Sequence, residues 1–522
     1  MSSSFRVRER VTRTDDAHLS IDHPDGVPMT LLASPEVPVE DDAIVQAVDF
    51  ARIAGTLDDL WRRQQAGAIA PYWGDAPGRL ERVVLTPDLH RGGGIPVGTV
   101  AACRGFVVPQ AVGNDVCCGM RLVVTDVTVD ELAPRLDALA RPLRHAYFEG
   151  GRDVPLSPRQ REAILRAGVA GLADTFADNA DQGIWRGLGR DGVVADLARA
   201  HLGGGLAARG LHGFGDWVRS SGGVHGRDAQ IGSIGGGNHF VELQVIEDVT
   251  DGATAHAWGV RRGRVAIMAH SGSVGLGHLV GGHFADRARG LYPAGVGHPA
   301  HGFYALPTAG PHAGEAARYL DALANAANFA FVNRLVLARL AARVLGEVLG
   351  RDVDARLIYD APHNLIWPAD DDLHLHRKGA CPAPGPGPVA PGAEPAFGWS
   401  GHPVIIPGSM GAASWLLAGE GAASALCSAC HGAGRSVARG AARHVEPAIW
   451  DAARSRLRVV TPIDVDDPIV RRRRDVVARH DDRLKEEGPW AYKDITPVVD
   501  TVARAGVARR VARLWPLLTV KG

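Results

Sequence analysis

Apolar residues recur along the chain with two spacings, which predict a mixture of helices and strands. Three stretches have the 3.6-residue periodicity of amphipathic helices, at 41–65, 159–206 and 315–349. Short apolar runs rich in β-branched residues predict strands at 121–127, 264–270, 356–360 and 403–409. The two kinds of element do not alternate regularly, so the pattern favours a complex α+β core over a doubly wound sheet. A Pro- and Gly-rich stretch at 381–398 predicts an extended surface loop.

The composition indicates a soluble protein with a large core. The chain has 522 residues, of which 46% are hydrophobic and 22% charged, and its net charge is -1. This charge excludes a polyelectrolyte binder of nucleic acid but is compatible with a local basic groove. The N-terminus has no apolar signal segment, and no run of apolar residues is long enough to cross a membrane. Six cysteines in so long a chain do not make a disulfide framework, so we expect a reduced, cytoplasmic protein.

The stretch CSACHGAGR, at 427–435, combines two signatures. Its first half, C-x-x-C-H, matches the attachment signature of a c-type haem. The expected cytoplasmic location disfavours haem, and the absence of a second C-x-x-C disfavours zinc, so we interpret Cys427 and Cys430 as structural. The second half is a Gly-rich turn followed by a cation, which is typical of phosphate binding.

Five potential metal ligands lie in Gly-rich turns near predicted strands: Asp115, Cys118, His239, His270 and His363. Carboxylate, thiolate and imidazole groups are the ligands that divalent transition metals prefer. Five exceed the need of one tetrahedral site, and a thiolate bridging two metals would account for the surplus. The sequence leaves open whether further histidines contribute, namely His225, His278, His283, His301 and His312. We interpret His374 and His376 as positioning residues.

Three Gly-rich turns, GGGNHF, PGSMG and HGAGR, have the character of phosphate sites, although none is a Walker A sequence. Histidine can attack phosphorus and carry a phosphoryl or nucleotidyl group. The residues alone therefore predict a metal-dependent enzyme that acts on phosphate, with His431 as the candidate nucleophile.

Nine motifs in order along the chain carry a resemblance to a known family. They are PDLHRGGGIPVGTV, GNDVCCGM, GGGNHF, HSGS-x-GLG, HRKGA, PGSMG, HGAGR, AYKD and VKG. Together they resemble the RtcB family of RNA-splicing ligases from about residue 30 to the last residue. The resemblance implies an N-terminal extension over 1–29 and one catalytic domain over 30–522. It also implies a single mixed α/β fold around a central dinuclear metal cleft.

The resemblance implies a GTP-dependent RNA ligase with two Mn²⁺ ions. Such an enzyme joins RNA 2′,3′-cyclic phosphate or 3′-phosphate ends to 5′-hydroxyl ends, as found in tRNA halves or damaged RNA. GMP passes from GTP to His431 and then to the RNA 3′-end. Whether an activating helper protein is needed stays open. Two alternatives stay open beside it: a paralogue that binds or processes RNA 3′-phosphate ends without efficient ligation, and a metal- or haem-binding module without catalysis.

The resemblance also assigns roles to residues. It gives Asp88 a catalytic role and makes Cys118 the bridge among the five metal ligands. The implied GTP-binding residues are Asn238, His239, Glu242, Ser409, His431, Gly432, Ala433, Gly434, Tyr492 and Lys521. The implied contacts to RNA or nucleotide phosphates are Lys378, Arg435 and Arg439.

The chain departs from the family pattern at three positions. Val274 replaces an arginine, Cys117 a glycine, and Ala438 a serine. Loss of the arginine is expected to weaken binding of RNA ends while leaving the metal site and GMP transfer intact, and it motivates the paralogue alternative. The run Arg471–Arg474 is interpreted as a solvated helix face because aspartates surround it.

Overall fold

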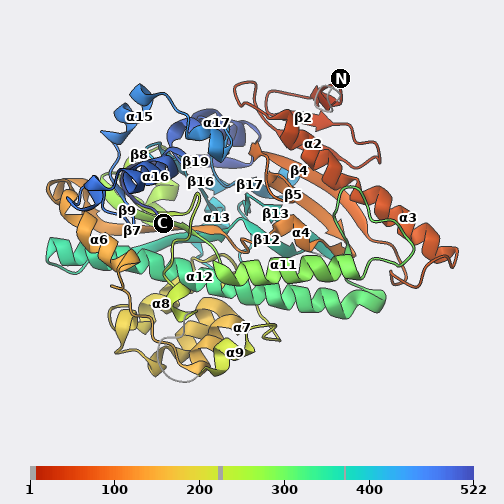
Figure 1. Cartoon of the computed structure of the whole chain (residues 1–522), viewed down its shortest axis with the longest axis horizontal. Helices are drawn as coiled ribbons and strands as arrows, with labels where there is room; N and C mark the ends of the chain where they lie inside the picture. Colours follow the sequence, from red (N-terminus) through yellow and green to blue (C-terminus); the bar gives the residue numbers. More distant parts are fainter. Residues whose placement is uncertain (1–6, 221–226, 370–371) are drawn as a thin grey trace.

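Two large sheets form the framework of the protein (Figure 1), which is described by a computed structural model covering residues 7–220, 227–369 and 372–522. In spatial order, the seven-stranded sheet contains β1 (Val11–Arg13), β2 (His18–Ile21), β3 (Met29–Leu32), β4 (Arg79–His90), β5 (Val97–Arg104), β13 (Leu373–Lys378) and β12 (Asn364–Pro368). The segment expected as an N-terminal extension thus contributes β1, β2 and the first residue of β3.

The eight-stranded sheet contains, in spatial order, β11 (Ala355–Pro362), β7 (Gly119–Thr128), β9 (Arg264–Ser271), β8 (Phe240–Val249), β19 (Ala508–Val520), β16 (Ser414–Gly419) and β15 (Pro403–Ile406). Its eighth strand, β18 (Val459–Val460), pairs in parallel with β19. Two small sheets pair β6 (Phe106–Val107) with β10 (Leu306–Pro307) and β14 (Ala380–Pro382) with β17 (Ser428–Cys430). The four strands predicted from the sequence are confirmed as β7, β9, β11 and β15, the last ending at Ile406.

The helices surround these sheets, and the longest is α12 (Ala313–Leu349). It is apolar on nearly all sides, as expected of a helix buried in the core of a large protein. Beside it lie α11 (Gly275–Gly290) and α7 (Pro158–Thr175). The remaining α-helices are α2 (Asp41–Ala51), α3 (Ile53–Gln65), α4 (Pro109–Val112), α5 (Val129–Leu132), α6 (Ala140–Phe148), α8 (Arg190–Leu197), α9 (Gly215–Arg219), α10 (Gly252–Trp258), α13 (Ala396–Ser400), α14 (Arg439–Ala442), α15 (Pro447–Arg454), α16 (Arg474–Lys485) and α17 (Ile495–Arg504).

The helix predictions hold to different degrees. The helix predicted over 315–349 is confirmed by α12, and the helix predicted over 41–65 is two helices that meet at Arg52. The stretch 159–206, predicted as helical, is confirmed in part: α7 and α8 are helices, short 3-10 turns and irregular chain lie between them, and Gly168 breaks the regularity of α7 with a φ of 59°. Within the described residues, no helix has both the length and the apolar character that a membrane crossing requires.

The pairing register of the eight-stranded sheet brings the ends of five neighbouring strands together along one edge. These strands are β11, β7, β9, β8 and β19. Cys118 directly precedes β7 and His363 directly follows β11, where Gly119 pairs with Pro362. His270 lies near the end of β9, where it pairs with Phe240, and His239 directly precedes β8. Because neighbouring strands run antiparallel, the start of one lies beside the end of the next. The end of β19 reaches the same edge through the pairing of Val520 with Val241.

Candidate active site

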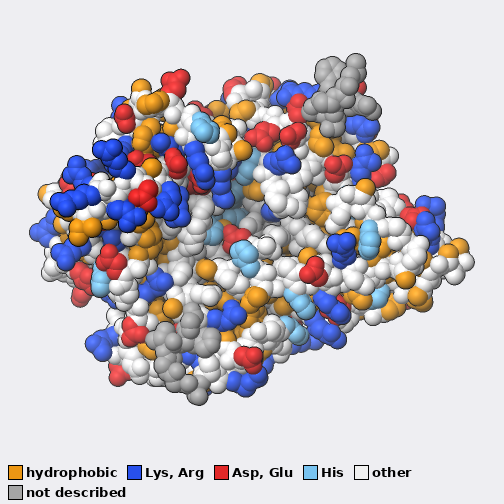
Figure 2. Space-filling model, viewed as in Figure 1, with side chains coloured by type: hydrophobic (Ala, Val, Ile, Leu, Met, Phe, Trp, Pro, Cys, Tyr) orange, Lys and Arg blue, Asp and Glu red, His pale blue; other side chains and the backbone are white. Residues whose placement is uncertain are grey.

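A cavity of about 650 Å³ opens at this edge, between residues of both large sheets. Figure 2 shows the molecule hollowed at the centre of one face, with histidine side chains inside the hollow. Most of the site residues expected from the sequence line it: Asp115, Cys118, Asn238, Glu242, His270, His363, Lys378, Ser409, His431, Gly432, Ala433, Gly434, Arg435, Arg439, Tyr492 and Lys521. The other two, Asp88 and His239, are buried and contact lining residues.

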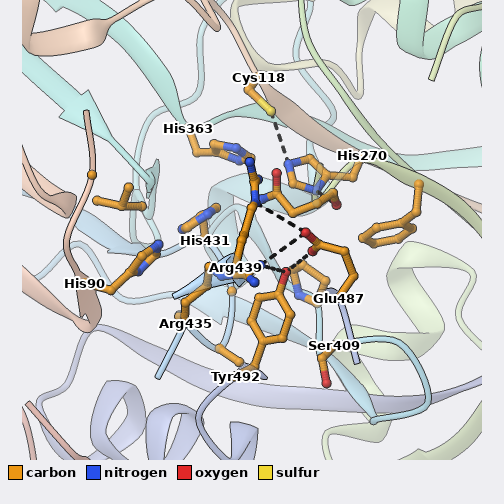
Figure 3. A pocket seen from close by; sticks show the side chains of 18 of the residues that line it. His90, Cys118, His270, His363, Ser409, His431, Arg435, Arg439, Glu487 and Tyr492 are labelled. Carbon is orange, nitrogen blue, oxygen red and sulfur yellow. Dashed lines mark hydrogen bonds and ion pairs between the residues drawn. The ribbon is translucent and has the colours of Figure 1, made fainter. Parts of the chain in front are cut away.

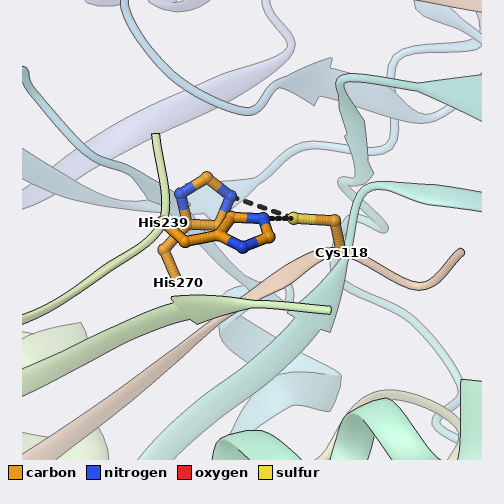
Figure 4. A group of neighbouring side chains, drawn as sticks. All are labelled: Cys118, His239 and His270. Atoms are coloured by element: carbon orange, nitrogen blue, oxygen red, sulfur yellow. Dashed lines mark hydrogen bonds between the residues drawn. The ribbon is translucent and has the colours of Figure 1, made fainter. Parts of the chain in front are cut away.

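The five expected metal ligands converge in this cavity. Cys118 Sγ lies 3.2 Å from His239 Nε2 and 3.1 Å from His270 Nε2 (Figure 4). Asp115 Oδ2 lies 3.0 Å from the same His239 nitrogen. The rings of His270 and His363 have centroids 5.1 Å apart. Within the described residues, Cys118, His239 and His270 are the one group of three or more such ligands whose donor atoms all lie within 4.8 Å of one another.

Backbone carbonyls orient two of these imidazoles. The Nδ1–H of His239 donates to Ile234 O at 3.1 Å, and the Nδ1–H of His270 donates to Asn238 O at 3.1 Å. Each ring is therefore oriented with Nε2 towards Cys118, and such backbone contacts orient metal-binding histidines. Burial and the nearby His239 hold the pKa of His270 well below its usual range, so the ring is neutral. Thiolate, imidazole and carboxylate together fit a divalent transition metal.

His431 is held by a buried carboxylate. Its Nδ1–H donates to Asp88 Oδ2 at 2.6 Å, and Thr86 Oγ1 donates to the other oxygen of Asp88 at 2.6 Å. Burial alone would raise the pKa of Asp88, but His431 and Thr86 lower it more, so the carboxyl group is ionised. Nε2 is therefore the ring nitrogen left free of the carboxylate, and the ring of His431 lies beside that of His363, with centroids 4.5 Å apart (Figure 3).

The last glycine of the HGAGR turn has a steric reason to be glycine. Gly434 has a φ of 77°, and a Cβ there would lie 2.3 Å from the carbonyl oxygen of Asp88. This close approach keeps the turn against the strand that carries Asp88. The turn therefore both lines the cavity and fixes the backbone around the His431–Asp88 pair.

A second buried carboxylate, that of Glu242, also lines the cavity. Glu242 accepts hydrogen bonds from Thr519 Oγ1 at 2.5 Å and from Gln244 Nε2 at 2.6 Å. Burial raises the pKa of Glu242 to about 7. Lys521 donates to Gly237 O at 2.5 Å, and burial lowers the pKa of Lys521 to about 8.

Arg435 and Arg439 are linked through an acid that the sequence did not predict. Glu487 is buried and pairs with Arg435 at 3.2 Å and with Arg439 at 3.4 Å (Figure 3). The guanidinium of Arg435 also lies over the ring of Tyr492, 4.9 Å from its centroid. Lys378 Nζ donates to Ile95 O at 2.9 Å, and burial lowers its pKa to about 8.

The sequence analysis assigned no role to two further residues that line or support the site. His90 lines the cavity, with Nδ1–H donating to Asp88 O at 2.7 Å. Lys493 donates to the carbonyls of Pro87 and Leu89, on either side of Asp88, at 3.1 and 2.8 Å. Both residues belong to motifs quoted above, His90 to PDLHRGGGIPVGTV and Lys493 to AYKD, and this membership is the sequence signal that points to them.

Comparison with known proteins agrees with this constellation. Residues 73–522 match the family model described as tRNA-splicing ligase RtcB. The chain belongs to the RtcB family. It is 35% identical to the RNA-splicing ligase RtcB of Mycobacterium tuberculosis over 85% of this chain and 98% of that protein. It is 31% identical to the tRNA-splicing ligase RtcB of Pyrobaculum aerophilum, over 86% of this chain and 89% of that one.

The departures from the RtcB pattern lie in distinct surroundings. Val274 is the residue before α11, has a φ of 50°, and is not among the residues that line the cavity. Cys117 is buried with a φ of 56°, a conformation that suits the usual glycine. Ala438 lines the cavity directly before Arg439 and precedes α14.

The remaining sequence features lie outside this RtcB site. In the part of the chain that the structure describes, no second metal-type cluster includes His278, His283, His301 or His312, while His225 lies outside the described residues. His376 is buried and accepts from Val108 N at 3.0 Å. Cys430 is buried in β17, and Cys427 Sγ donates to Gly421 O at 3.4 Å. The arginines at 471–474 are exposed at the start of α16.

Proposed function

We propose that this RtcB-family chain is an RNA ligase. It joins RNA ends that carry a 2′,3′-cyclic phosphate or 3′-phosphate to ends that carry a 5′-hydroxyl, and it uses GTP and Mn²⁺. The relatives that it resembles are named RNA-splicing or tRNA-splicing ligases. The observation that carries the proposal is the His431–Asp88 pair, at 2.6 Å, beside a cluster of transition-metal ligands in one cavity.

In the first step His431 acts as the nucleophile. Asp88 holds the proton on Nδ1, so the lone pair of Nε2 attacks the α-phosphorus of GTP. The N–P bond forms while the bond from the α-phosphorus to the bridging oxygen breaks, and pyrophosphate leaves. Asp88 also stabilises the positive charge that develops on the ring as the bond forms.

Asp115, Cys118, His239, His270 and His363 would hold the two Mn²⁺ ions. Bound ions would neutralise the negative charge that develops on phosphate oxygens. The residues of this chain supply the rest: Ile234 O and Asn238 O fix the imidazoles through their Nδ1–H groups.

The guanine base is read by the buried end of the cavity. The Glu242 carboxylate accepts hydrogen bonds from the N–H edge of guanine, and Lys521 faces the carbonyl oxygen of the guanine ring. Tyr492 supplies an aromatic face, while Asn238, Ser409 and the Gly432–Gly434 turn contact sugar and phosphates.

The RNA ends occupy the part of the cavity lined by Lys378, Arg435 and Arg439. An oxygen of the RNA 3′-phosphate attacks the phosphorus of His431–GMP, the N–P bond breaks, and the imidazole is regenerated. The 5′-hydroxyl oxygen then attacks the 3′-phosphate and GMP leaves. Guanidinium groups suit this task because they bind phosphate through two parallel hydrogen bonds. RNA is therefore the proposed partner, and an activating helper protein stays a prediction.

A cytoplasmic location belongs to the same proposal. All six cysteines are free thiols, which suits a reducing compartment.

Labelled GTP tests the mechanism directly. Incubation of the full chain with α-labelled GTP and Mn²⁺ should give a covalent protein–GMP adduct, and His431→Ala should give none. An adduct in the variant, or none in the wild type, would refute His431 as the nucleophile.

The departure at Val274 favours a second candidate, an RtcB-type protein that activates RNA 3′-phosphate ends without efficient ligation. Substrates with both kinds of end separate the two. Joined RNA supports the ligase, whereas adduct formation and GMP transfer without joined RNA supports the second candidate.

A further inference from the structure

Two neighbouring polar residues in the middle of α12 are completely buried. Asn333 and Arg334 both have no exposed surface and do not line the cavity. Burying an amide or a guanidinium costs free energy unless hydrogen bonds compensate. The proposed reaction gives neither residue a role, so their bonding partners are informative.

Arg334 binds three segments at once. Its Nη1 donates to Cys117 O at 2.6 Å and to Ser271 O at 3.1 Å, and its Nε donates to Asp360 Oδ1 at 2.9 Å. Each partner lies within three positions of an expected metal ligand: Cys118, His270 and His363. One guanidinium therefore fixes the backbone beside three ligands that come from three strands.

Asn333 binds the end of β9 and the loop that precedes His239. Its Nδ2 donates to Ser271 Oγ at 3.1 Å, to Gly272 O at 3.0 Å and to Ser233 O at 3.1 Å. Its Oδ1 accepts from Gly232 N at 2.8 Å and from Ser233 N at 3.1 Å. The amide thus joins the end of β9 to the loop that leads to His239.

The hydrogen bonds of Asn333 extend to the ring of an expected metal ligand, His239. Ser271 Oγ accepts from Asn333 and donates to Ile234 O at 2.8 Å. The same carbonyl oxygen accepts from His239 Nδ1 at 3.1 Å. A chain of hydrogen bonds therefore runs from α12 to the imidazole of His239.

We propose that Asn333 and Arg334 are positioning residues for the metal centre, acting from the buried helix through the segments that carry Cys118, His239, His270 and His363. This inference rests on the proposed metal site. Residues that orient ligands in this way set the affinity and geometry of a metal site without touching the ion. Because the ligand atoms are held together in advance, less conformational entropy is lost when the ion binds.

Binding of Co²⁺ to the metal-free full chain tests the inference without any reaction. The affinity and the thiolate-to-Co²⁺ absorption band are measured for wild type, Asn333→Ala and Asn328→Ala. Asn328 is the matched control: it is buried on the same helix and bonds Leu206 N at 2.6 Å and Leu165 O at 2.8 Å, away from the ligand segments. Asn333→Ala should weaken Co²⁺ binding roughly 10–100-fold and alter the band, whereas Asn328→Ala should change neither.

Equal affinity and equal spectra in the two variants would overturn the inference. If Asn333→Ala does not fold, Ser271→Ala removes only one hydroxyl from the same chain of hydrogen bonds and should weaken binding in the same direction. Unchanged binding by a folded Ser271→Ala protein would then overturn the role of the amide. A wild-type protein without a thiolate band would instead refute the proposed metal site, and so is distinguishable from failure of the positioning role alone.

Discussion

His431 Nδ1 and Asp88 Oδ2 lie 2.6 Å apart although the two residues are 343 positions apart in the sequence. Because an ionised carboxylate can only accept, this contact fixes the proton on Nδ1. Thr86 holds the other carboxylate oxygen, so the carboxyl plane is fixed as well. In the neutral ring the lone pair is therefore on Nε2.

Asp88→Asn should reverse this arrangement. Thr86 would keep the amide oxygen, so the amide NH₂ would face Nδ1 of His431 and move the ring proton to Nε2. We expect adduct formation from labelled GTP to fall by roughly 10⁴-fold, as when a catalytic imidazole takes the wrong tautomer. Unaltered Co²⁺ binding would be the control, since Asp88 is not an expected ligand. A loss of less than tenfold would contradict this role.

The neighbouring cysteines should behave differently toward metal. Cys118 Sγ lies 3.1 Å from His270 Nε2, whereas Cys117 Sγ lies 3.9 Å from the Arg334 guanidinium. Cys118→Ala should abolish the thiolate-to-Co²⁺ band and adduct formation. Cys117→Ala should retain both, which makes it the matched control. A band that persists in Cys118→Ala would exclude Cys118 as the thiolate ligand.

Guanosine binding should depend on pH through Glu242. Burial raises the pKa of this carboxyl group to about 7, and the charged neighbour Lys521, with a pKa of about 8, stays protonated below that value. The ionised form accepts from guanine, so affinity is present above pH 7 and is lost as pH falls, by roughly tenfold per unit. Calorimetry with guanosine between pH 5.5 and 7.5 measures this without involving phosphate. A pH dependence that survives in Glu242→Gln would assign it to another group.

Val274→Arg tests the departure from the family pattern. The resemblance places an arginine that binds RNA ends at this position, so the new cation should raise ligation efficiency roughly tenfold, the effect of one charge-assisted hydrogen bond. Adduct formation should not change, because the substitution leaves the His431–Asp88 pair untouched. Val274→Gly is the control, since it accommodates the φ of 50° without adding charge. Equal ligation by the two variants would show that the cation is irrelevant.

The elements that the sequence predicts best are those whose pattern is local. The helix α12 and the strands β7, β9 and β11 follow directly from apolar spacing. The stretch predicted as helical over 159–206 is helical in α7 and α8 only, and α7 is kinked at Gly168, where a Cβ would lie 2.3 Å from Gly204 O. That contact depends on the packed fold and leaves no periodic signal.

The candidate site shows the same division. Residue types in Gly-rich turns point to the candidate ligands and to His431, because the proposed chemistry needs those side chains. Glu487 and Lys493 were not predicted, because their roles depend on contacts with residues that only the fold brings near them. Sequence spacing also cannot show that Arg334 reaches Cys117, 217 positions away.

The position of β19 in the large sheet has a consequence for biogenesis. This strand lies between β8 and β16, yet it comes from 508–520. A ribosome must therefore synthesise more than 500 preceding residues before the sheet can close. Until then β8 and β16 each expose an unpaired edge, which is a site for aggregation. The newly made chain should thus depend on chaperones during this interval and fold slowly through its long-range pairings.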